Sequence, residues 1–235
     1  MRLLYVSVAL NILGLIGLIW LVHRLGGVNY LRYRLAAGPN IGAIYEHKRS
    51  QYEELTMEPG ATIMLGNSLT EYGDWEEWLG LDTLYNRGIA GDVTDNLLKR
   101  LDPIVQARPK RVFLCIGIND LLFHPPEYVL QNYERILERF RQESPTTEVV
   151  VTPLLPINNE VRQTGIDPAA ILAVNHGLPP LAARYHSPLL EVASKLTDAD
   201  GRLDARFTLD GIHLNGPAYR IWADALRSYL EQAEE

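Results

Sequence analysis

From residue 61 onward, short apolar runs alternate with longer stretches in which apolar residues recur at helical spacing. Runs that are apolar on both faces are typical of strands inside a parallel sheet, and amphipathic stretches are typical of the helices that cover it. The pattern therefore predicts an α/β domain with helices on both faces of the sheet. The expected strands are 61–65, 83–86, 111–116, 148–155 and 188–192. The expected helices are near 92–106, 126–143, 168–185 and 217–231.

A different apolar pattern occupies the N-terminus, where residues 3–22 contain no charged side chain. A helix of this length spans about 30 Å, the thickness of a hydrocarbon core. A cleavable signal peptide is the alternative, but the run is long for one, and His23-Arg24 follows it instead of a small-residue cleavage site. We therefore expect a single-pass transmembrane anchor over 1–24, a connector with an amphipathic helix over 25–60, and a folded domain over 61–235.

The residues around the expected anchor bear on its orientation and association. Arg2 precedes the apolar run, whereas Arg24, Arg32 and Arg34 follow it, so the positive-inside rule leans toward a cytoplasmic domain by a small margin. Asn11 lies among small residues and could hydrogen-bond to a second anchor helix or within its own helix. The sequence leaves the side of the membrane open and allows a homodimer through the anchor.

Composition excludes several other classes of protein. A net charge of −7 argues against a nucleic-acid partner. The single cysteine, Cys115, rules out an intrachain disulfide framework and falls in an apolar run, where a buried side chain is expected. The six histidines show no metal-ligand spacing, so we expect neither a metal nor another cofactor.

Polar residues and glycines follow the first three predicted strands, where an open parallel sheet binds its ligands. Ser68 follows the first strand, Gly88 the second and Asn119 the third, and Asp210 precedes His213 by three residues near the end of the chain. Each has an ordinary explanation as a helix cap or loop residue. Together they supply a nucleophile, a base, an orienting carboxylate and donors for an oxyanion, namely the Ser68 and Gly88 N–H groups and the Asn119 amide.

These motifs resemble the four blocks of the SGNH, or GDSL-type, hydrolases. The blocks are Gly66-Asn67-Ser68-Leu69, Gly88, Gly117-Ile118-Asn119-Asp120 and Asp210-Gly211-Ile212-His213. Residues 86–94, 109–114, 154–157 and 174–175 are similar to the platelet-activating-factor acetylhydrolase-like branch. The resemblance covers about residues 61–230 and leaves the anchor unexplained.

The resemblance implies a flavodoxin-like three-layer sandwich with a five-stranded parallel sheet in the order 2-1-3-4-5. It also implies that Ser68 is the nucleophile, that His213 is the general base and then acid, and that Asp210 orients His213. Ser68, Gly88 and Asn119 would form the oxyanion hole. One residue departs from the family pattern, because Asn67 stands where the family usually has aspartate. That aspartate is not the triad acid, so we expect Asn67 to affect local hydrogen bonds or pH dependence without abolishing the chemistry.

The expected function is that of a membrane-anchored serine ester hydrolase that forms an acyl-enzyme. Its substrate would be a lipid ester, such as a lysophospholipid, or a short-chain acyl ester. An O-acetylesterase that acts on sugars or glycans is an alternative. A non-catalytic, membrane-tethered binding protein on the same fold is another, with Asn67 as its only support among the motifs.

Overall fold

The computed structural model of the chain describes residues 2–24 and 41–233. It divides into two units, Met1–Ile44 and Tyr45–Glu235. The first unit contains helix α1 (Arg2–Arg24), and helix α3 (Ile41–Glu54) begins in it and continues into the second unit. The connector predicted over 25–40 lies outside the described residues. Helix α3 corresponds to the amphipathic helix predicted before the domain.

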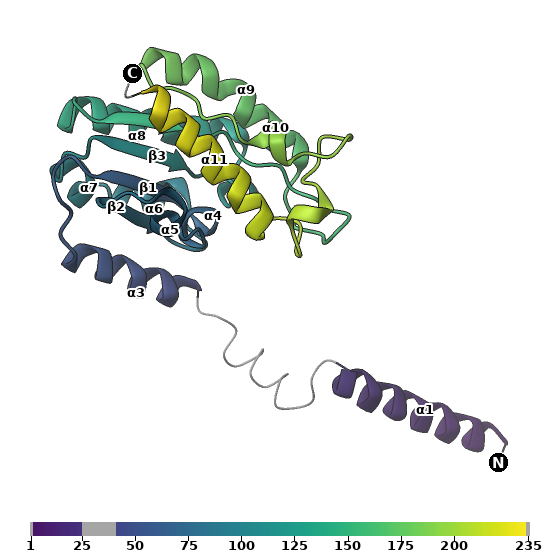
Figure 1. The fold of residues 1–235 in the computed structure, drawn as a ribbon. Helices are drawn as coiled ribbons and strands as arrows, with labels where there is room; N and C mark the ends of the chain where they lie inside the picture. The colour runs from purple at the N-terminus through teal and green to yellow at the C-terminus, as the bar shows by residue number, and fades with distance from the viewer. Residues whose placement is uncertain (1, 25–40, 234–235) are drawn as a thin grey trace. The chain divides into compact units, whose positions relative to one another are not determined.

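The second unit is built on a four-stranded parallel sheet in the order β2-β1-β3-β4 (Figure 1). The strands are β1 (Thr62–Gly66), β2 (Leu84–Gly88), β3 (Arg111–Cys115) and β4 (Glu148–Val151). Gly66 pairs with Gly88 on one side and with Cys115 on the other. Strands β2, β1 and β3 therefore end level with one another, and the segments that follow them meet at one edge of the sheet.

The predicted fifth strand is the main difference between the expected and observed sheets. Residues 188–192 make only an isolated parallel bridge, Leu189 to Val151, so the sheet has four strands within the described residues. Strand β4 also ends at Val151, four residues earlier than predicted. Pro153 and Pro188 have no N–H to donate to a ladder, which limits how far the last two segments can pair.

Helices cover both faces of the sheet, as the alternating pattern predicts. They are α4 (Ser68–Glu71), α5 (Trp75–Leu79), α6 (Thr94–Lys99), α7 (Asp102–Gln106), α8 (Pro126–Glu143), α9 (Pro168–Arg184), α10 (Ala193–Leu196) and α11 (Gly216–Gln232). Two 3₁₀ turns, η1 (Asp120–Leu122) and η2 (Ala205–Phe207), complete the list. The single helix predicted over 92–106 is two helices, because α6 ends before Arg100 and Pro103 lies in the first turn of α7.

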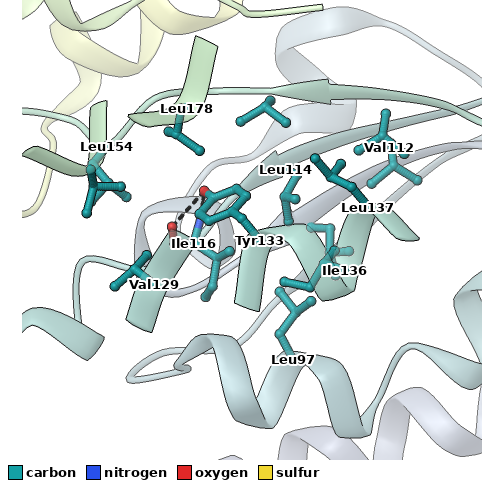
Figure 2. Packing of buried hydrophobic residues seen from close by; sticks show 14 of the residues in the cluster. Leu97, Val112, Leu114, Ile116, Val129, Tyr133, Ile136, Leu137, Leu154 and Leu178 are labelled. Carbon is teal, nitrogen blue, oxygen red and sulfur yellow. Dashed lines mark hydrogen bonds between the residues drawn. The ribbon is translucent and has the colours of Figure 1, made fainter. Parts of the chain in front are cut away.

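Alternate residues of each strand enter different cores. Ile63 and Leu65 pack with residues of α6 to α9, whereas Met64 packs with residues of α5 and α11. Figure 2 shows part of the first core, in which the Tyr133 hydroxyl donates a hydrogen bond of 2.7 Å to the Ile116 carbonyl. Cys115 is buried in the second core, as expected from its apolar surroundings.

Within residues 2–24 and 41–233, no helix has both the length and the hydropathy that crossing a membrane requires.

Candidate active site

Ser68 lies at the turn between β1 and α4, where it is the first residue of the helix. Asn67 caps this helix, because its side-chain oxygen accepts a hydrogen bond of 3.0 Å from the Leu69 N–H. The cap is buried, with 1% of Asn67 exposed, so the turn around Ser68 is held from inside the protein. The Ser68 N–H has no hydrogen-bond partner among the described residues, as is usual for the first N–H of a helix.

The Ser68 hydroxyl is the first member of a chain of three side chains. Its Oγ lies 3.0 Å from Nε2 of His213, which is 145 residues away in the sequence. Nδ1 of the same ring lies 2.6 Å from Oδ2 of Asp210. Since the ionised carboxylate can only accept, Nδ1 carries a proton and Nε2 of the neutral ring is free to accept the Ser68 hydroxyl proton. The structure thus brings together the three residues predicted to form the triad.

Asp210 is held in its ionised form by the loop that carries it. Its Oδ1 accepts hydrogen bonds from the backbone N–H groups of Ile212 and His213, at 3.1 and 2.8 Å. Partial burial acts to raise the pKa of Asp210, but the hydrogen bonds from His213 and from these backbone groups outweigh it and lower the pKa to about 2. A negative charge therefore faces the imidazole and would stabilise its protonated form.

The donors for an oxyanion differ from the prediction at Gly88. The Gly88 N–H already donates to Oδ1 of Asn86 at 2.9 Å. A Cβ at this position would lie 2.2 Å from the backbone nitrogen of Glu71, so residue 88 must be glycine for β2 to pack against α4. Gly88 is thus a packing residue whose N–H is occupied, and the assignment of that N–H to the oxyanion hole is wrong.

The free N–H of this segment belongs to Gly91, which the sequence analysis did not select. Gly91 has a φ of +76°, and its N–H has no hydrogen-bond partner in the part of the chain that the structure describes. The carbonyl of the next residue, Asp92, accepts a hydrogen bond of 2.9 Å from Nδ2 of Asn119, so the segment lies against this predicted donor. The second N–H of the Asn119 amide remains available. A second glycine at the end of Gly88-Ile89-Ala90-Gly91 was the available signal.

We call residues 88–92 the oxyanion loop. A buried ion pair lies next to this loop. Arg100 donates to Oδ2 of Asp92 from two nitrogens, at 2.9 and 2.7 Å. The same guanidinium donates to the carbonyls of Gly66 and Arg87, at 3.0 and 2.9 Å. Burial raises the pKa of Asp92 to about 6 although Arg100 opposes the shift. One side chain thus connects the ends of β1 and β2 to the oxyanion loop.

Exposed apolar side chains occur on the segments that carry or neighbour the candidate site residues, and we call them the apolar rim. Its members are Tyr72, Leu122, Phe123, Val161 and Leu209, which are between 37% and 91% exposed. The Tyr72 ring packs on His213 with 5.3 Å between centroids, and Leu209 precedes Asp210 directly.

Contacts between loops connect the rest of the rim. A Cβ built on Gly165 would lie 3.3 Å from Leu122, and one built on Gly211 would lie 2.4 Å from the Asn158 carbonyl. The loop that carries Val161 therefore runs between Leu122 and the segment that holds Asp210.

No group of three or more histidine, cysteine, aspartate or glutamate side chains could hold a metal ion among the residues that the structure describes. Burial raises the pKa of Cys115 to about 12, so this thiol is not a nucleophile. Ser68, with its two partners, is therefore the candidate nucleophile among the described residues.

The pattern of the GDSL-like Lipase/Acylhydrolase family matches residues 60–221, which is more than half of the chain. This chain belongs to the GDSL-like lipase/acylhydrolase family. The match begins just before β1 and ends within α11, so it includes the triad and the oxyanion loop. The family match and the hydrogen-bonded chain of Ser68, His213 and Asp210 thus fall in the same part of the chain.

Solved structures share the fold of this chain. One, described as a platelet activating factor from Streptococcus pneumonia, is 30% identical, with a TM-score of 0.74 over 81% of this chain and 94% of that one. A GDSL-like lipase from Bacteroides thetaiotaomicron is 20% identical, with a TM-score of 0.69 over 80% of this chain and 98% of that one, and shows the shared fold.

Among curated proteins, the chain is 22% identical over 184 residues to an N-acylneuraminate cytidylyltransferase of Streptococcus agalactiae. The aligned region covers 78% of this chain and 42% of that protein, so the chain spans less than half the length of this relative.

Proposed function

We propose that this GDSL hydrolase is a membrane-anchored serine esterase that cleaves lipid-like esters through an acyl-enzyme. The observation that carries the proposal is the continuous chain from Ser68 through His213 to Asp210, with distances of 3.0 and 2.6 Å. A nucleophile, a base and an orienting carboxylate in hydrogen-bond contact are the arrangement that acyl transfer requires.

In the first half of the reaction, Oγ of Ser68 attacks the ester carbonyl carbon and its proton passes to Nε2 of His213. The negative charge that develops on the carbonyl oxygen would be stabilised by the unoccupied N–H groups of Ser68 and Gly91 and by the Asn119 amide. When the carbon–oxygen bond breaks, His213 returns the proton to the leaving alcohol, and the acyl group stays on Ser68.

In the second half, water attacks the acyl-enzyme and gives a proton to His213. The new tetrahedral centre collapses, the acid leaves, and the proton returns to Oγ of Ser68. Asp210 stays ionised throughout and stabilises the imidazolium that forms in each half.

The apolar rim favours a lipid-like ester over an acetylated sugar. Phe123 is 77% exposed and Leu209 is 91% exposed, and both lie within a few residues of the catalytic blocks. A substrate with a long acyl chain would bury these side chains, at about 25 cal/mol per Å² of apolar surface removed from water, whereas a sugar would leave them in water. The 30% identity to the Streptococcus pneumonia protein supports membership of the platelet-activating-factor acetylhydrolase-like branch.

The anchor is the second part of the proposal, and it rests on the sequence. Residues 3–22 carry no charge over a length that could span a hydrocarbon core. An enzyme tethered in this way would meet esters that partition into the bilayer. The Asn11 amide donates a hydrogen bond of 2.8 Å to the Ser7 carbonyl of its own helix, and its side-chain oxygen is the group through which two anchors would associate.

The test is a series of p-nitrophenyl esters from C2 to C12, assayed with wild type and the Ser68→Ala variant. Hydrolysis should disappear in Ser68→Ala and persist in Ser50→Ala, whose exposed hydroxyl donates to the His47 carbonyl. Undiminished turnover by Ser68→Ala would refute the mechanism. Lack of reaction of the wild type with a fluorophosphonate probe would favour the non-catalytic binding protein.

The same series separates the two substrate classes. A maximum at C8 or longer supports the lipid-like ester, and a steep loss beyond C4 supports the O-acetylesterase. If the rim selects the chain, Leu209→Ser should lower the C8-to-C2 ratio of kcat/KM by about tenfold, the effect of roughly 1.4 kcal/mol of lost apolar contact. Leu55→Ser is the matched control, since Leu55 is also exposed but precedes β1.

A further inference from the structure

Each backbone N–H of the oxyanion loop from residue 88 to residue 90 donates a hydrogen bond. The Gly88 N–H is bonded to Asn86, and the Ile89 N–H donates to the Gly66 carbonyl at 3.1 Å. The Ala90 N–H donates to Oε2 of Glu71 at 2.6 Å. The next N–H, that of Gly91, has no partner among the described residues. Its direction therefore depends on whatever holds residues 88–90.

Helix α3 supplies two of those contacts, although it precedes the residues matched by the family pattern. The Tyr52 hydroxyl donates a hydrogen bond of 3.0 Å to the Gly88 carbonyl. One turn earlier, the Lys48 ammonium lies 3.3 Å from Oε1 of Glu71, whose other oxygen accepts from the Ala90 N–H. The helix thus contacts the loop directly at residue 88 and through a carboxylate at residue 90.

The space between α3 and the domain is filled and does not form a ligand site. The Tyr52 ring lies over the Arg87 guanidinium at 4.7 Å, and only 5% of Arg87 is exposed. The cavity that remains beside these two side chains is about 10 Å³, which is room for one water molecule at most. The helix therefore acts through its contacts with the loop rather than by forming part of a pocket.

We propose that α3 is a positioning element for the oxyanion hole and that Tyr52 is its main positioning residue. By holding the Gly88 carbonyl, Tyr52 sets the course of the chain through Ile89 and Ala90 to the Gly91 N–H. The inference rests on the proposed function, because it concerns the transition state of the same ester cleavage. Preorganised donors stabilise the developing oxyanion only when they point at its position, so a small displacement of the loop lowers the rate of the chemical step.

The test compares two tyrosines of α3 that each donate one hydroxyl hydrogen bond to the domain. Tyr52→Phe removes the bond to Gly88 and keeps the ring over Arg87. Tyr45→Phe, the matched control, removes a bond of 3.2 Å to the Asn96 carbonyl, outside the oxyanion loop. We expect Tyr52→Phe to lower kcat on p-nitrophenyl butyrate about tenfold, less than the roughly 100-fold effect of losing an oxyanion donor itself. We expect KM to stay within about twofold.

Binding of a boronic acid provides the readout that a purely structural role would not change. A boronic acid forms a tetrahedral anion on the serine, so its Ki should rise in Tyr52→Phe in proportion to the loss of kcat/KM. Tyr45→Phe should match wild type in kcat and Ki, even if both variants lose similar thermal stability. Rates are normalised to the number of active sites that react with a fluorophosphonate.

Equal kcat and Ki in Tyr52→Phe and wild type would overturn the positioning role, as would equal losses in both variants. Those results would leave the esterase function intact, because wild type would still cleave the ester. If wild type cleaves no ester, the proposed function fails, and this inference fails with it.

Discussion

At the scale of single residues, His213 is oriented by contacts on three sides. Asp210 holds Nδ1, Ser68 lies at Nε2, and the Tyr72 ring packs on the imidazole at 5.3 Å. The ring therefore faces the nucleophile in the tautomer that general-base catalysis requires. Asn67, which departs from the family pattern, caps α4 from a buried position through a hydrogen bond from the Leu69 N–H.

The low pKa of Asp210, about 2, leads to a prediction about pH. The folded pKa lies below the value of about 3.9 for an unfolded chain. The carboxylate therefore stabilises the folded state fully above about pH 4, and this contribution is lost as the pH falls toward 2. We expect the difference in unfolding free energy between wild type and Asp210→Asn to be constant from pH 5 to 7 and to shrink below pH 4.

Urea unfolding at each pH measures this difference, and the carboxyl carbon of Asp210 should show no NMR titration step above about pH 3. Loss of kcat/KM between pH 7 and 5 would then come from another group of the site. A titration step near pH 4 or above would contradict the assigned hydrogen bonds.

At the scale of elements, the active site is assembled by side chains that join the ends of strands and helices. The Asn86 amide donates to three carbonyls at the end of α4, those of Thr70, Glu71 and Gly73, each at 3.1 Å. Arg100 joins β1, β2 and the oxyanion loop from the other side. Both side chains hydrogen-bond to backbone carbonyls of neighbouring segments, which ties the loop to the sheet.

Arg100 should therefore be far more costly to remove than a half-buried arginine near the surface. Arg100→Met leaves Asp92 buried without its cation, and we expect a loss of about 3–5 kcal/mol in unfolding free energy. Arg139→Met is the control, because Arg139 pairs with Asp102 and Glu143 near the surface and should cost about 1 kcal/mol or less.

Urea unfolding of both variants measures the contrast. Adding Asp92→Leu to Arg100→Met should recover part of the stability, since the unpaired charge is then gone. Equal losses for the two arginine variants would show that burial of the ion pair has little energetic consequence.

At the scale of the whole molecule, the groups of the candidate site lie together at one edge of the four-stranded sheet. The level ends of β1, β2 and β3 place Ser68, the oxyanion loop and Asn119 beside one another, and the loop before α11 brings Asp210 and His213 to the same edge. The segments that meet at this edge carry the exposed apolar side chains of the rim. This is the feature on which the proposal of a lipid-like ester rests.

The proposed anchor leads to a prediction for the full chain. Wild type should stay with the membrane fraction through an alkaline carbonate wash, and its mass should include residues 1–24. A Leu13→Lys, Ile16→Lys variant should be released, because each charge at the centre of a bilayer costs about 2.5–3.5 kcal/mol. Leu172→Lys, at an exposed position of α9, should remain bound. A shortened protein in the soluble fraction would instead support the signal peptide.

The sequence by itself determined much of the fold and the reacting groups. Alternating apolar runs located the four strands and the covering helices, and the motifs predicted Ser68, Asp210, His213 and Asn119 as site residues, of which the structure brings the first three into one hydrogen-bonded chain. These features can be predicted from sequence because buried strands and catalytic sites both require particular residue types within short stretches of the chain.

Only the tertiary structure decided which backbone groups are free. The sequence does not distinguish Gly88 from Gly91. In the structure, the Gly88 N–H donates to Asn86, and the Gly91 N–H has no partner among the described residues. The fifth strand is reduced to one bridge, and Tyr52 reaches Gly88 from 36 residues away. Each outcome depends on hydrogen-bond partners that come from distant parts of the chain, and no local pattern records them.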